Sequence, residues 1–250
     1  MEIMWYQAVQ TINIFGVYLQ VWGLLLAVGV ICAWFLFDYN LWWRGIKHDS
    51  SWVMSGAIIS GLLGSRVLQI ILDWDYYSKN LNKIVAIWEG GMASYGAYIF
   101  LFVFLFWYIG KYVDRKTDFL EAGIGPMFLA LAIARIGCFM INDHFGKTSG
   151  VPWAILSLGE MRHPISLYYV LMDFSLFFLG SYLYYTKKCY DYLFWLMIGL
   201  YAVLRLMVDL LWKDWLGNDS SFYGTILSSI VFILISLVMI WRKIKKKAIF

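Results

Sequence analysis

The sequence has 250 residues, of which 62% are hydrophobic and only 14% charged, and its mean hydropathy is +0.69. A soluble domain is usually about half apolar and a quarter charged, so this composition excludes an ordinary soluble fold and leaves room for about six to eight membrane helices of roughly 20 residues each. The net charge of +4 is no signal of nucleic-acid binding, because much of the excess follows the last apolar run. The three cysteines form no CxxC pair, which argues against a disulfide framework or a zinc site.

Seven apolar runs of spanning length follow one another along the chain. In hydrocarbon the backbone hydrogen bonds must be closed internally, and runs of this length favour helices over the strands of a β-barrel. The runs cover Ile12–Phe37, Trp52–Leu72, Tyr95–Val113, Phe119–Ile141, Ile165–Tyr185, Tyr192–Trp212 and Tyr223–Trp241. We therefore expect an all-α integral membrane protein with about seven transmembrane helices. It should fold as a single polytopic membrane domain over residues 1–250, with the outer-face segment 142–164 as a small cap.

Lysine and arginine fall unequally on the two sides that these helices define. Twelve of them occupy one set of connections and the C-terminal tail, against five in the opposite set. The richer set comprises Arg44, Lys47, Lys111, Arg115, Lys116, Lys187, Lys188, Arg242, Lys243, Lys245, Lys246 and Lys247. Because connections rich in these residues stay in the cytosol, we expect the N-terminus outside and the C-terminus in the cytosol.

Three further arginines, Arg66, Arg135 and Arg205, lie within the second, fourth and sixth runs. A charge at mid-bilayer costs about 2.5–3.5 kcal/mol even on the lenient insertion scale, so each requires a partner or a function. At about 1.5 Å of rise per residue, all three fall at one depth in the outer-leaflet half. One interpretation is an ion pair that locks two helices, which suits Arg205 because Asp209 follows four residues later. The other is that the three bind an anion, and a phospholipid phosphate matches the planar guanidinium fork.

Polar residues from other segments are expected at the same depth, at the ends of the third, fourth and fifth runs. Each has an ordinary structural interpretation: a helix cap for Ser94, an interfacial hydrogen-bond donor for His163 and a small packing residue for Cys138. Their convergence on one side of the membrane instead predicts a polar site. The segments are Ser94–Gly96, Cys138–Lys147 and His163–Tyr168.

Six blocks along the chain resemble, in order, those of the prolipoprotein diacylglyceryl transferase family. The blocks are Gly61–Arg66, Trp88–Gly96, Ala134–Lys147, Val151–Ala154, Arg162–Tyr168 and Gly199–Asp209. The resemblance implies a multi-pass enzyme of the bacterial cytoplasmic (inner) membrane that faces the outer leaflet. Such an enzyme moves the diacylglyceryl group of phosphatidylglycerol onto the lipobox cysteine thiol of a prolipoprotein, and glycerol phosphate leaves. It implies phosphatidylglycerol, the prolipoprotein signal-peptide region and membrane lipid as partners, and no cofactor or metal.

The resemblance also implies roles for single residues. Arg135 and Arg205 are expected to bind the phosphate and make it a tolerable leaving group, with Arg66 in support or at the headgroup. Tyr95 falls at the position of the family's usual base. The remaining substrate-binding positions are Ser94, Gly96, Gly137, Cys138, Asn142, Gly146, His163, Ser166, Tyr201 and Asp209.

The departures from the family pattern leave the base open. Tyr95 replaces a histidine, and Tyr169 replaces the glutamate that follows Leu-Tyr. A thiol of pKa about 8.5 must lose its proton, and tyrosine, with a pKa of about 10, is a poor base at neutral pH. The alternatives are tyrosinate at Tyr95, His144 or Asp143 in its place, and deprotonation that is either assisted by the substrate or unassisted. The loss of the histidine also favours an alternative class, a non-catalytic or differently specific lipid-binding membrane protein of the same fold.

Overall fold

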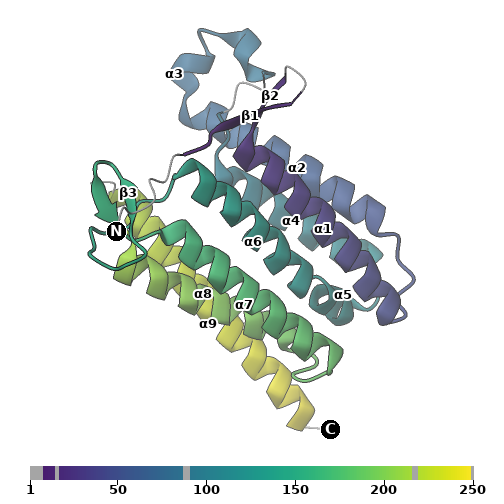
Figure 1. Ribbon diagram of the computed structural model, residues 1–250. Helices are drawn as coiled ribbons and strands as arrows, with labels where there is room; N and C mark the ends of the chain where they lie inside the picture. Colours follow the sequence, from purple (N-terminus) through teal and green to yellow (C-terminus); the bar gives the residue numbers. More distant parts are fainter. Residues whose placement is uncertain (1–7, 15–16, 87–90, 216–218, 249–250) are drawn as a thin grey trace. The chain divides into compact units, whose positions relative to one another are not determined.

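The structure, a computed structural model, describes residues 8–14, 17–86, 91–215 and 219–248 (Figure 1). Within these residues, seven helices are long and apolar enough to cross a membrane, which confirms the expected all-α membrane fold. They lie in α1 (Val21–Trp43), α2 (Ser50–Leu72), α4 (Ser94–Tyr112), α5 (Lys116–Ala122) with α6 (Ile124–Ile141), α7 (Ile165–Tyr185), α8 (Leu193–Trp212) and α9 (Asp219–Ala248). Trp88, Glu89 and Gly90 of the second family block lie outside the described residues.

The start of the first span is a correction to the sequence prediction. The apolar run from Ile12 begins as a β-hairpin in which β1 (Thr11–Ile14) pairs antiparallel with β2 (Val17–Gln20). Polar and β-branched residues alternate in β1, as is typical of a strand, and hydropathy alone does not separate such a segment from a helix. The helix begins at Val21 and continues past Phe37 to Trp43.

The chain divides into two compact units, which are described separately. The first comprises Met1–Arg44 and Leu120–Phe250, and the second comprises Gly45–Phe119. The expectation of one polytopic domain over residues 1–250 stays a prediction.

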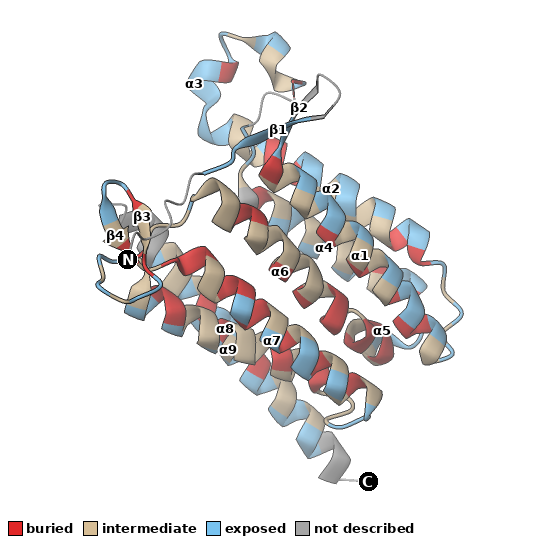
Figure 2. Ribbon diagram, in the orientation of Figure 1, coloured by how far each residue is buried: buried red, intermediate tan, exposed pale blue. Residues whose placement is uncertain are grey.

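In the first unit, neighbouring helices pack in the order α1, α6, α7, α8 and α9. Small residues allow the closest approaches: a Cβ added at Gly137 of α6 would lie 3.1 Å from the Cα of Trp22 in α1. Buried residues concentrate along α6 and α7, whereas α9 is largely exposed (Figure 2). The exposed side chains of α9 are mostly apolar, as is expected of a helix that faces lipid.

At one end of this unit, a buried arginine joins α1 to its neighbours. The guanidinium carbon of Arg44 lies 4.5 Å from the ring centre of Tyr184, and its Nη2 lies 3.6 Å from a carboxylate oxygen of Glu121. The hydroxyl of Tyr184 donates to the carbonyl of Asn40 over 2.8 Å. These contacts lie at the end where α1 and α7 finish, opposite to the end where α6 and α8 finish.

In the second unit, α2 packs against α4 through two glycines. A Cβ added at Gly64 would lie 2.4 Å from the carbonyl oxygen of Gly96, so only glycine fits this crossing. α2 begins with Asp49 as its N-cap, whose side chain accepts from the backbone N–H of Ser51 over 2.9 Å. Between the two spans lie α3 (Trp74–Tyr77) and a short 3₁₀ turn, η1 (Leu81–Ile84).

Candidate active site

Two of the three predicted arginines meet at one aromatic side chain. Arg135 on α6 and Arg205 on α8 both approach the ring of Tyr169 on α7, with their guanidinium carbons 4.9 and 4.0 Å from its centre. Tyr169 is fully buried, and both distances are those of cation–π contacts. The fold of the first unit therefore brings two positive charges to one place.

Asp209 holds one of these arginines. It follows Arg205 by one helical turn and accepts a hydrogen bond from its Nε over 3.0 Å. The other carboxylate oxygen accepts from the hydroxyl of Tyr169. The ion pair that was one interpretation of Arg205 is thus present, and it belongs to a larger cluster.

The cluster also contains buried polar atoms that have no hydrogen-bond partner. Among the residues that the structure describes, Nη1 of Arg205 and both carboxylate oxygens of Asp173 are buried without one. Asp173 is fully buried on α7 and interacts electrostatically with Arg135 and Arg205. Because an unsatisfied buried polar atom is costly, a buried guanidinium nitrogen with no partner is a donor that an anionic ligand can satisfy.

His144 lies between a group that can only accept and a group that can only donate. Its Nδ1 bonds to a carboxylate oxygen of Asp143, and its Nε2 lies 3.2 Å from Nη1 of Arg135. A carboxylate accepts and a guanidinium donates, so the hydrogen is on Nδ1 and Nε2 carries a lone pair. Burial lowers the pKa of His144 from its usual value, and Arg135 and Arg205 lower it further, while Asp143 raises it. The lowered pKa favours the neutral imidazole, in the tautomer that these two partners select.

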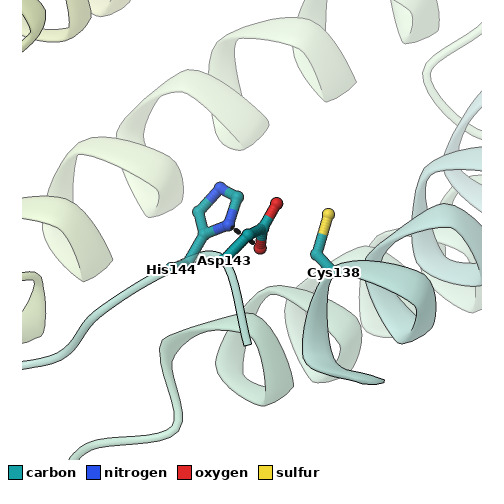
Figure 3. Close-up of side chains that lie close together, drawn as sticks. All are labelled: Cys138, Asp143 and His144. Atoms are coloured by element: carbon teal, nitrogen blue, oxygen red, sulfur yellow. Dashed lines mark hydrogen bonds and ion pairs between the residues drawn. The ribbon is translucent and has the colours of Figure 1, made fainter. Parts of the chain in front are cut away.

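Cys138, near the end of α6, completes this corner of the site (Figure 3). The ligand atoms of Cys138, Asp143 and His144 lie within 4.8 Å of one another, a donor set that zinc accepts. However, Nη1 of Arg135 lies 4.0 Å from the sulfur and also contacts the imidazole. This positive charge opposes a cation between the three groups, so the corner is better suited to an anion.

The segment that carries Asp143 and His144 is fixed against the end of α8. The backbone N–H of Lys147 donates to the carbonyl of Trp212 over 2.8 Å, and its ammonium donates to the carbonyls of Leu210 and Leu211. Such bonds satisfy the free carbonyls at a helix C-terminus. Further along, β3 (Ile155–Ser157) pairs with β4 (Glu160–Arg162) as a hairpin within the predicted cap segment 142–164.

Arg162 and Gly146 hold this hairpin to the site. Arg162 donates to the carbonyl of Gly146 over 3.1 Å and to the carboxylate of Asp214 over 2.6 Å. A Cβ added at Gly146 would lie 2.2 Å from the carbonyl oxygen of His163, so the close approach of the two chains requires glycine. The structure therefore gives Gly146 a packing role.

Three other predicted residues have contacts within the protein. Asn142 ends α6 in the left-handed conformation, with φ of 54°, and its amide donates to the hydroxyl of Ser157 over 3.1 Å. His163 bonds through Nδ1 to the hydroxyl of Tyr168 over 2.8 Å, and burial lowers its pKa. Tyr201 packs on the ring of Phe128.

Ser166, also predicted to bind substrate, lies in the first turn of α7. It is buried, and among the described residues its hydroxyl has no hydrogen-bond partner. Like Nη1 of Arg205, this hydroxyl is a buried donor that a ligand can satisfy.

The other predicted residues belong to the second unit. Arg66 is buried, and its guanidinium donates to the carbonyls of Lys83, Ile84, Ala86 and Gly91, so it organises the segment after α3. α4 begins at Ser94 with Ala93 as its N-cap, one residue before the cap expected at Ser94. Tyr95 is 53% exposed, and Gly96 lies at the crossing with α2.

Three residues of the cluster were missed by sequence reasoning: Tyr169, Asp173 and Lys213. Tyr169 and Asp173 lie about one and two turns into α7 from Ile165, and both interact with Arg135 of α6 and Arg205 of α8. Lys213 follows α8, interacts electrostatically with Asp209, Arg205 and Arg135, and has its pKa lowered by burial. For Tyr169 the sequence did contain a signal, because this tyrosine replaces the glutamate of the family pattern.

The fold and this cluster define a multi-pass helical membrane protein with a buried cationic site at one end of its helices. The sequence model of the prolipoprotein diacylglyceryl transferase family matches residues 10–242. The chain therefore belongs to the prolipoprotein diacylglyceryl transferase family.

Comparison with individual relatives supports the same family assignment. The chain is 29% identical to the phosphatidylglycerol–prolipoprotein diacylglyceryl transferase of Finegoldia magna over 238 residues, which cover 94% of both proteins. It is 30% identical to the enzyme of the same name from Clostridioides difficile over 208 residues, covering 81% of this chain and 82% of the relative. With that of Fervidobacterium nodosum it shares 30% over 212 residues, or 78% and 72% of the two chains.

Proposed function

We propose that the chain transfers the diacylglyceryl group of phosphatidylglycerol to the lipobox cysteine thiol of a prolipoprotein. The observation that carries this proposal is the pair Arg135 and Arg205 over one buried ring, with a buried Nη1 of Arg205 that has no hydrogen-bond partner among the described residues. Relatives that cover most of the chain carry this activity in their names. A lipid phosphodiester would supply the hydrogen-bond acceptor that Nη1 of Arg205 lacks among the described residues.

The reaction needs a leaving group and a nucleophile. The thiolate sulfur attacks the sp3 carbon of the diacylglyceryl group, a C–S bond forms, and the C–O bond to phosphate breaks. The electron pair of the broken bond stays on the phosphate oxygen, and glycerol phosphate leaves. Charge thus develops on the phosphate, where two guanidinium groups in a buried setting stabilise it more than water does.

We propose that Nε2 of His144 accepts the proton of the thiol. This nitrogen already carries a lone pair, since Asp143 accepts the hydrogen on Nδ1. In the free protein Arg135 donates to Nε2 over 3.2 Å. When Arg135 turns to the phosphate, the lone pair becomes available to the incoming thiol. In this proposal Tyr95, in the second unit, is not the base, and Arg66 supports the segment that precedes it.

We place the site toward the outer leaflet of the bacterial cytoplasmic membrane, with the C-terminus in the cytosol. The ends of α6 and α8 and the start of α7 carry the cluster, whereas Arg44, Lys187, Lys188 and the basic residues that end α9 lie at the opposite helix ends of the same unit. A C-terminal fluorescent-protein fusion that folds only in the cytosol tests the orientation. Absence of fluorescence from a stable fusion would refute it.

The activity is tested with purified protein, phosphatidylglycerol and a synthetic lipobox peptide in detergent, by following the mass of the peptide. We expect a gain of one diacylglyceryl group. Arg135→Lys and Arg205→Lys should each reduce the rate at least tenfold, because lysine lacks the planar fork.

Arg44→Lys is the matched control, since Arg44 is also buried and stacked on a tyrosine but lies at the other end of the first unit. It should lower thermal stability and leave turnover intact. Lipid bound by the wild-type protein without any gain in peptide mass would refute the transfer and favour the non-catalytic lipid-binding alternative.

A further inference from the structure

We propose that Tyr169 is a positioning residue that holds the two phosphate-binding guanidinium groups against one buried ring and so limits their separation. This inference rests on the proposed function, because it concerns the same lipid phosphate. It assigns a role to a buried side chain at which the sequence departs from the pattern of its family.

Three contacts converge on this one ring. The guanidinium carbons of Arg135 and Arg205 lie 4.9 and 4.0 Å from its centre, and the imidazole of His144 meets it edge to face at 5.8 Å. These groups come from α6, from α8 and from the segment after α6. Two carbons at fixed distances from one centre cannot lie further apart than the sum of those distances, so the ring limits the separation of the two charges.

The kind of contact matters for what remains available to a ligand. A carboxylate at this position, such as the glutamate of the family pattern, would accept hydrogen bonds from the N–H groups that a phosphate needs. An aromatic face attracts a guanidinium through its quadrupole and does not use up the N–H edge. Tyr169 therefore holds both arginines through its ring face, and not through a hydrogen-bond acceptor.

The hydroxyl adds a second constraint. It donates to one carboxylate oxygen of Asp209, and the other oxygen accepts from Nε of Arg205 over 3.0 Å. Tyr169 thus orients the carboxylate that orients Arg205. The bond at Nε leaves Nη1 of Arg205 buried with no hydrogen-bond partner among the described residues. Removing the hydroxyl should loosen Arg205 and leave the contact with Arg135 intact.

The test measures apparent KM separately for phosphatidylglycerol and for the lipobox peptide. Tyr169→Leu removes the aromatic face, and we expect KM for the lipid to rise by about tenfold or more, the effect of losing desolvated cation–π contacts. KM for the peptide should stay within twofold. Tyr169→Phe keeps the face and loses only the bond to Asp209, so KM for the lipid should rise by about threefold.

Tyr184 provides a matched control on the same helix. It too is buried, stacks on an arginine at 4.5 Å and donates to an oxygen, but it does so at the far end of α7. Tyr184→Leu and Tyr184→Phe should lower thermal stability and leave both KM values unchanged. If Tyr169 had a purely structural role, its Leu and Phe variants would likewise lower thermal stability and leave both KM values unchanged.

Each outcome decides one question. Wild-type protein without transfer would overturn the proposed function itself. Active wild-type protein with an unchanged lipid KM in Tyr169→Leu would overturn the role of Tyr169 and leave the function standing. If Tyr169→Leu does not fold, Tyr169→Phe decides, and an unchanged lipid KM in that variant would overturn the constraint assigned to the hydroxyl.

Discussion

Replacing His144 by glutamine tests where the thiol proton goes. Glutamine has a carbonyl oxygen that can accept a hydrogen bond from Arg135, in place of the 3.2 Å contact that Nε2 of His144 makes. The variant therefore keeps an acceptor for Arg135 and removes the basic nitrogen. A positioned general base contributes about 10²–10⁴-fold in rate. We therefore expect kcat to fall by that factor, which corresponds to about 2.7–5.4 kcal/mol of transition-state stabilisation.

The pH dependence gives an independent check. Because burial lowers the pKa of His144 in the free protein, the neutral imidazole is favoured at pH 7, and kcat/KM for the lipid should fall only when the pH drops below that lowered pKa. Asp143 raises the pKa of His144, so Asp143→Asn should move this acid limb to still lower pH and reduce kcat by about tenfold, less than His144→Gln.

The assay measures the initial rate at which the lipobox peptide gains mass, at pH values between about 4.5 and 8. His48→Gln is the matched control, since His48 is also half-buried and bonded to a tyrosine, but in the second unit. It should leave the rate and the acid limb unchanged. A His144→Gln enzyme that keeps both the wild-type rate and its acid limb would refute the assignment and return deprotonation to Tyr95 or to the substrate phosphate.

Three further predictions concern stability, each read as the melting temperature in one detergent. Asn142→Val should destabilise the protein by about 1–2 kcal/mol, because φ of 54° strains a β-branched residue, whereas Asn142→Gly should be tolerated. Lys147→Met should cost about 0.3–1 kcal/mol by exposing the last carbonyls of α8, and Lys147→Arg should retain that cap. Gly64→Ala should cost about 1–3 kcal/mol at the crossing with Gly96, while Gly61→Ala, whose Cβ would meet nothing within 4 Å, should not destabilise. Equal melting temperatures within any of these pairs would contradict its explanation.

The spans could be predicted from the sequence because length and hydropathy constrain a membrane helix strongly. The hairpin at Thr11–Gln20 could not, since an apolar strand and the start of an apolar helix have the same hydropathy. The meeting of the ends of α6 and α8 with the start of α7 followed from the alternating direction of successive spans. That alternation is what brought Arg135, Arg205 and His144 together in the prediction.

Depth along a helix does not determine where a side chain points around it. Arg66 shares the predicted depth of the other arginines, yet its guanidinium bonds to backbone carbonyls of Lys83, Ile84, Ala86 and Gly91. Tyr169 was missed for a second reason: an aromatic residue in an apolar helix usually contacts lipid or packs against other side chains. Only the packing of α6 and α8 against α7 shows that both guanidinium groups stack on it.

The contact between Arg135 and His144 links lipid binding to proton transfer. While Arg135 donates to Nε2, the imidazole has no free lone pair, and the positive charge beside it opposes protonation. A phosphate that draws Arg135 away both frees Nε2 and brings a negative charge close to it, so the pKa of His144 should rise when the lipid binds. The acid limb of kcat, which reports the complex, is therefore expected at higher pH than that of kcat/KM for the lipid, which reports the free enzyme. In this arrangement the base gains strength only when the leaving group is already bound, and coincident limbs would show that the two events are not coupled through Arg135.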